Sequence, residues 1–176
     1  MRIFLRAGLV LALCASGAFA AQDVVGAVDG TVKAVDKASK TVAVKTADGT
    51  EHTFHFIGKT VAHGAKATAG GSKDAFLSMK DGDEVVVHYT AKGAVMTAQE
   101  VDHIGEGGLK MSVVAVKSVD RGAKTVTVKT AEGAEETYHL TDNALRETGK
   151  GLDKTGKVTV YYSEEGGKKI AHFFKS

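Results

Sequence analysis

Apolar and polar residues alternate with a period of two along most of the chain after residue 30. This alternation is typical of strands that bury one face. Turn segments containing Gly separate the alternating runs, as expected for short strands joined by hairpins. In the first half of the chain the pattern predicts five strands, at 31–35, 41–45, 52–56, 84–89 and 95–101.

The segment 41–56 predicts a β-hairpin whose register follows from its side chains. A three-residue loop at 47–49 sets Val42 opposite Phe54 on the buried face, whereas a two-residue loop would break that alternation. The longer loop also places Gly49 where a left-handed backbone is required. We therefore expect a three-residue turn.

The chain contains an internal repeat. Residues 31–56 match residues 115–140 with 15 identities in 26 positions, and 84–93 match 157–166. Such self-similarity indicates duplication of one structural unit. The predicted hairpin register turns the shared histidine, His55 in one copy and His139 in the other, away from the core.

The predicted order is three strands, a connection and two further strands. A short helix at 72–80 fits the connection, and this order is that of an OB-type barrel. The second copy leaves room for about one helical turn within 143–157. We therefore predict an all-β protein of two tandem five-stranded OB-like barrels, at 22–105 and 110–176, that pack on one another.

The first 20 residues have the pattern of a secretory signal peptide. A charged start precedes the apolar run 7–14, and small residues precede an expected cleavage after Ala20. The run is shorter than the ~20 residues that span a bilayer. A lipoprotein signal with Cys14 as the lipid-bearing residue is the alternative, although Leu13 is bulky where such signals have a small residue. The expected location is the periplasm or the cell exterior.

The net charge of +2 belongs to this leader. The chain has 23 Lys and Arg against 21 Asp and Glu, and the leader holds two Arg and no acid. A balanced remainder argues against nucleic acid as a partner. The single Cys also lies in the leader, so the exported part has neither a disulfide nor a thiolate metal site. No cofactor and no membrane span beyond the leader are expected.

Two stretches, 30–50 and 77–89, resemble small exported bacterial β-barrel domains. One such group is an OB-like family of unknown function with a "G-T-V-x-x-V-D" opening. The barrel of the periplasmic copper/silver chaperone of heavy-metal efflux systems is similar. That family's metal site uses a His with a Trp and a Met-x-Met pair. This chain has no Trp, and Met79, Met96 and Met111 stand alone, so the resemblance implies the barrel without its metal motif.

Histidines on the predicted strands are the candidates for metal binding. Chelating pairs such as His-x-His or His-Glu-x-x-His do not occur in the sequence. Solvated surface histidines are the competing interpretation, and we assign no metal site. The weak candidates are His55, His88, His103 and His139.

No catalytic motif stands out. The acids at 81–84 lie in a predicted turn, and the Gly-rich segment 64–71 lacks the Gly-Lys-Ser/Thr of a phosphate loop. The sequence therefore favours a non-enzymatic, exported binding or cell-envelope accessory module that contacts an unknown protein or small ligand. The alternative is a periplasmic metal-handling protein, for copper or zinc, that uses surface histidines.

Overall fold

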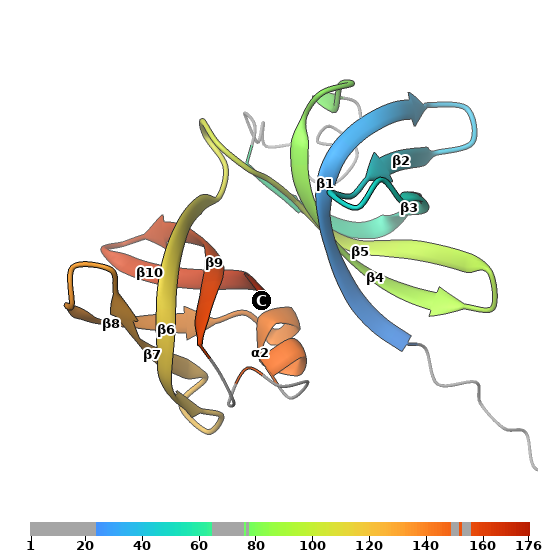
Figure 1. The fold of residues 1–176 in the computed structure, drawn as a ribbon. Helices are drawn as coiled ribbons and strands as arrows, with labels where there is room; N and C mark the ends of the chain where they lie inside the picture. Colours follow the sequence, from blue (N-terminus) through green and yellow to red (C-terminus); the bar gives the residue numbers. More distant parts are fainter. Residues whose placement is uncertain (1–23, 65–75, 77, 149–151, 153–155) are drawn as a thin grey trace, which may run out of the picture.

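The computed structural model describes residues 24–64, 76, 78–148, 152 and 156–176. The described residues form two closed five-stranded barrels that lie side by side (Figure 1), which confirms the all-β prediction. The elements are β1 (Val24–Asp36), β2 (Thr41–Lys45), β3 (Glu51–His63), β4 (Glu84–Lys92), β5 (Val95–His103), β6 (Lys110–Asp120), β7 (Thr125–Thr130), β8 (Glu135–Leu140), α2 (Asp142–Thr148), β9 (Lys157–Glu165) and β10 (Lys168–Lys175). The expected signal peptide lies outside the described residues. None of the helices in the described ranges has the length and hydropathy of a membrane-spanning helix.

The strand order of the first barrel is β1-β2-β3-β5-β4. The pairs β1–β2, β2–β3 and β4–β5 are antiparallel, whereas β3 and β5 are parallel. The first strand closes the barrel because its early half pairs with β4 and its later half with β2. The predicted strand at 31–35 was therefore too short, since the structure begins it at Val24.

The repeated hairpin has the predicted register. Val42 pairs with Phe54, and Gly49 takes a left-handed backbone with φ of 88°. The second barrel repeats this turn, with Val126 opposite Tyr138 and the corresponding Gly133 at φ 89°. Both hairpins therefore present alternate side chains to the interior of their own barrel.

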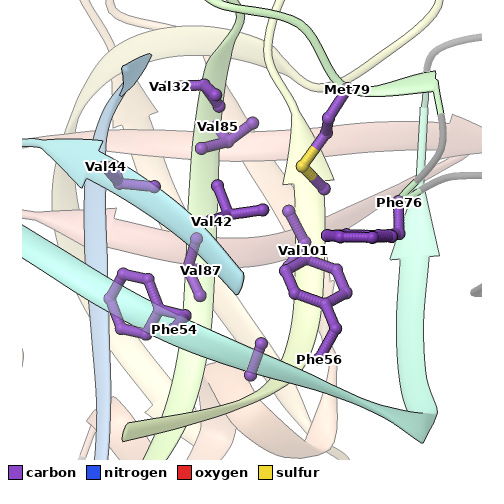
Figure 2. Packing of buried hydrophobic residues seen from close by; sticks show 11 residues of the cluster. Val32, Val42, Val44, Phe54, Phe56, Phe76, Met79, Val85, Val87 and Val101 are labelled. Atoms are coloured by element: carbon purple, nitrogen blue, oxygen red, sulfur yellow. The ribbon is translucent and has the colours of Figure 1, made fainter. Parts of the chain in front are cut away.

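The core of the first barrel consists of these alternating valines and aromatics (Figure 2). Burying each such side chain contributes ~1.5–3 kcal/mol. Phe76 and Met79 close one side of this core, and the ring of Phe76 lies 4.7 Å from that of Phe56. Most of the helix predicted at 72–80 lies outside the described residues, although Phe76 and Ser78 are helical.

The second barrel has a longer helix than expected. We predicted about one turn, but α2 runs over seven residues from Asp142 to Thr148. Thr141 explains its start, because its Oγ1 accepts a hydrogen bond from the Ala144 N–H at 3.1 Å. The positive charge of Arg146 in the last turn interacts favourably with the helix dipole. The buried Ala144 packs the helix against the core.

The two barrels pack against each other, as predicted. An apolar cluster joins them, formed by Val86 of β4, Leu109, Tyr161 of β9 and Phe173 of β10. Beside it, Lys175 Nζ donates to Asp29 Oδ2 at 2.6 Å. We call this inter-barrel contact the seam.

The joint between the barrels is a hydrogen-bonded turn. Leu109 N–H donates to the His103 carbonyl at 2.7 Å, and Gly105 N–H donates to the Leu109 carbonyl at 3.0 Å. A Cβ on Gly108 would lie 2.2 Å from the His103 carbonyl oxygen. Backbone contact therefore fixes how the second barrel leaves the first.

Candidate metal centre

The third strand continues past the predicted end at residue 56. The register against β5 shifts between Phe56 and Val61. Thr60 stabilises this irregular segment, because its buried Oγ1 accepts a hydrogen bond from the Ile57 N–H at 3.0 Å and donates one to the Ala98 carbonyl at 2.7 Å. Pairing then resumes, and it sets His63 beside Asp102.

The strand β5 supplies two carboxylates to the same region. Glu100 and Asp102 are two residues apart, so they share one face of the strand. That face points away from the first barrel's core, which Val101 enters from the opposite side. Both acids are nevertheless buried, Asp102 completely, because they lie at the seam beneath the second barrel.

The second barrel contributes His172. A β-bulge lies between Ala171 and Phe173, so two successive residues oppose one partner residue. The His172 side chain is 3% exposed. Its Nδ1 lies 3.4 Å from Glu100 Oε1 and 3.4 Å from Asp102 Oδ2, while its Nε2 lies 3.0 Å from Ser163 Oγ.

Four side chains from three strands and both barrels thus converge. We call them the seam cluster: His63, Glu100, Asp102 and His172. One donor atom of each lies within 4.8 Å of every other. A tetrahedral ion with bonds of ~2.0–2.1 Å holds its ligand atoms about 3.3 Å apart. The measured contacts, from 2.8 Å between His63 Nδ1 and Asp102 Oδ1 to 3.4 Å for His172, are close to that spacing.

The neighbours of the cluster orient its donors. Glu100 Oε2 accepts a hydrogen bond from the Asn143 amide of α2, which leaves Oε1 facing the histidines. The hydrogen bond between His172 Nε2 and Ser163 Oγ holds the ring so that Nδ1 faces the two carboxylates. Asp102 Oδ2 is buried, and its ion-pair contact with His172 Nδ1 is long, at 3.4 Å. The His63 side chain is 43% exposed, so an ion can enter from that side.

Contacts within the seam cluster shift the pKa values of its members even without an ion. Hydrogen bonds to Asp102 and Glu100 raise the pKa of His63 to about 10. Burial lowers the pKa of His172, but its hydrogen bonds to the same acids outweigh burial and raise that pKa to about 9. Burial raises the pKa of Glu100, yet hydrogen bonds from both histidines hold it well below its usual range. An ion-free site therefore holds protons where a metal would bind.

The four histidines singled out from the sequence lie elsewhere. His55 and His139 are exposed and face Thr41 and Thr125, as the register predicted. His88 and His103 are buried, so their interpretation as solvated histidines was wrong.

The error at His88 concerns what covers it. His88 points away from the core of its own barrel, but the outer face of β4 is the seam, and its ring lies 6.2 Å from that of Phe173. Its Nε2 is 3.9 Å from Asp102 Oδ2, behind the seam cluster. His103 Nδ1 lies 3.9 Å from Asp83, and burial lowers the pKa of its imidazole.

None of the four members of the seam cluster was among the candidate metal ligands predicted from the sequence. The Glu-x-Asp spacing at 100–102 was a usable signal, since it places two acids on one strand face. His63 stood beyond the predicted end of its strand. His172 stood at a bulge, where alternation no longer gives the side-chain direction.

Solved structures of CusF are similar to this chain. A silver(I) complex of CusF is 18% identical and covers 46% of this chain and 97% of its own, with a TM-score of 0.34. The apo form from Escherichia coli is 20% identical over 48% of this chain and 92% of its own, at 0.34. An E. coli CusF–Ag(I) structure is 20% identical over 47% and 95%, at 0.35. No protein-family model and no curated protein matches the chain. The seam cluster is accordingly interpreted from this chain's own geometry.

Proposed function

We propose that this protein binds one divalent transition-metal ion at the seam cluster, as an exported metal-handling module. The observation that carries the proposal is the convergence of two imidazole nitrogens and two carboxylate oxygens within 4.8 Å at a buried seam. The buried Asp102 carboxylate adds support, because its two oxygens face His63 at 2.8 Å and His172 at 3.4 Å. The proposed role is binding rather than catalysis.

The donor set favours zinc-class ions. Imidazole suits Zn²⁺, Cu²⁺, Fe²⁺ and Ni²⁺, and carboxylates suit harder ions, whereas Cu(I) prefers the soft sulfur of Cys and Met. The seam cluster has no sulfur donor. Two carboxylates with two neutral imidazoles carry a charge of −2, which a divalent ion neutralises. Binding also releases the protons that the two histidines hold.

Calorimetric titration of the metal-stripped protein tests this proposal. We expect about one Zn²⁺ per chain, with Cu²⁺ also binding and Mn²⁺ weaker, in the general order of affinities for such sites. His63→Ala removes a ligand at a half-exposed position and should weaken binding by more than about 10-fold. His55→Ala, an exposed histidine on the same strand, is the matched control and should bind as the parent does. Absence of binding, or equal binding by both variants, would contradict the proposal.

A second candidate function is a metal-free binding module in which the cluster only locks the barrels together. The raised pKa values of His63 and His172 favour it, because two imidazolium ions opposite two carboxylates balance the charge. A raised folded-state pKa stabilises the fold fully below the ordinary value of 6.5, and this stability is lost as pH rises through about 9 to 10. Chelator-treated protein should therefore lose stability on alkalinisation in denaturant titrations. The lock is the better account if this loss occurs and no ion binds.

A further inference from the structure

The ligands of the seam cluster are divided unequally between the barrels. The first barrel supplies His63, Glu100 and Asp102, and the second supplies His172 alone. The second barrel also supplies Asn143, whose amide holds the far oxygen of Glu100. A complete site therefore exists only while the barrels are docked.

Each barrel organises its own share independently. The backbone pairing of β3 with β5 within the first barrel places His63 beside Asp102. His172 forms a hydrogen bond with Ser163, which lies on β9, the strand that pairs with β10 in the second barrel. Neither arrangement uses the other barrel, so the seam alone determines whether the fourth ligand reaches the other three.

Docking of the second barrel buries two carboxylates of the first. The second barrel covers Glu100 and Asp102, which leaves them 7% and 0% exposed. Burying carboxylates is unfavourable unless opposite charge accompanies them. A divalent ion held between the two barrels supplies this opposite charge next to both acids. The apolar part of the seam is small, with Val86, Leu109, Tyr161 and Phe173 as its buried members.

We propose that ion binding and barrel docking are coupled, so that the ion acts as a clamp that the second barrel closes through His172. This inference rests on the proposed metal function. Coupling between two equilibria is reciprocal: whatever weakens docking weakens ion binding, and whatever removes the fourth ligand removes the effect of the ion on docking. The short, hydrogen-bonded joint at 104–109 keeps the barrels close, so rejoining is an intramolecular step at high effective concentration.

The test uses a seam residue that is neither a ligand nor the cross-strand partner of one. Leu109→Ser places a hydroxyl in the buried apolar seam, where Leu109 bridges Ile104. Val113→Ser also replaces an apolar residue by serine, at a valine that is 53% exposed on β6. We expect Leu109→Ser to weaken Zn²⁺ binding about 10-fold by calorimetry and to be more extended than the parent in small-angle X-ray scattering after chelation. Added Zn²⁺ should restore its compactness. Val113→Ser should behave as the parent in both measurements.

His172→Gln supplies the reciprocal arm. Zn²⁺ should bind this variant at least about 10-fold more weakly, through the three ligands of the first barrel, and should no longer change the scattering. Equal Zn²⁺ affinities for Leu109→Ser and Val113→Ser would overturn the clamp, as would compaction of His172→Gln by Zn²⁺. In either case the parent's Zn²⁺ binding would still support the metal function. A parent that binds no Zn²⁺ would remove both proposals together.

Discussion

The last strand of each barrel presents its outer face to the seam, but the two faces differ in chemistry. Residues 84–93 match 157–166 in sequence, so His88 corresponds to Tyr161. Glu100 pairs with His88, and Phe173 pairs with Tyr161. A buried acid in the first barrel thus occupies the position of a buried aromatic ring in the second.

The same comparison applies to the bulges. The register of β5 shifts at Gln99, and that of β10 shifts at His172. Both copies keep the irregularity, but only the second uses it to present an imidazole to the other barrel. The repeated histidines, His55 and His139, are exposed and lie outside the seam cluster. In this protein the candidate site is found where the two copies differ, and the elements they share build the scaffold.

Substitution of the corresponding residues on β5 and β10 gives the largest expected difference. Asp102→Asn removes a fully buried carboxylate that faces both histidines, so Zn²⁺ binding should weaken by more than about 100-fold. The ion-free protein should lose about 3 kcal/mol of unfolding free energy, since a buried charge pair loses one partner. Calorimetry and urea denaturation measure the two effects.

The matched change in the second barrel is Lys175→Met. Its Nζ pairs with Asp29 at 2.6 Å, but the Lys175 side chain is 41% exposed. Partly solvated pairs contribute at most about 1 kcal/mol, and this one includes no ligand. If the two variants bind Zn²⁺ equally well, Asp102 is not a ligand.

The two barrels also differ in the segment that follows the repeated hairpin. Thr60 holds the extended end of β3 in the first barrel, whereas Thr141 caps α2 in the second. Thr60→Val leaves the Ile57 N–H and the Ala98 carbonyl without their buried partner. We expect a loss of about 2 kcal/mol in denaturant titrations. Zn²⁺ affinity should fall as well, because this residue positions the strand end that carries His63.

The counterpart in the second barrel is Thr141→Ala, which removes the cap of α2. Loss of such a cap typically costs about 1 kcal/mol. Thr141→Ser retains the hydroxyl and should restore the stability. A Thr60→Val variant as stable as the parent would show that the extended end of β3 does not depend on this side chain.

Much of the scaffold was predictable from local patterns. The three-residue turn, the pairing of Val42 with Phe54 and the outward direction of His55 follow from alternation and one glycine, and the structure confirms them. The length of β1 was not predictable in this way, because Gly26 and Gly30 interrupt its alternation while the closing contact with β4 holds it extended.

The candidate site was beyond such rules for a physical reason. His88 points away from its own barrel, but burial depends on what covers a face, and here that is the other barrel. His63 follows a register shift and His172 lies within one, and a period of two fails at both places. Local alternation describes single barrels, whereas the seam cluster exists only between two of them.

The turns that the copies share should give the smallest difference between barrels. Gly49 and Gly133 have φ of 88° and 89°, and a Cβ at either meets no atom closer than 3.8 Å. Gly49→Ala and Gly133→Ala should therefore each lose about 1 kcal/mol through backbone strain alone. In denaturant titrations the two losses should agree within about 0.5 kcal/mol, and neither variant should change Zn²⁺ affinity. A larger loss in one barrel would show that the two hairpins, although alike in geometry, support their barrels unequally.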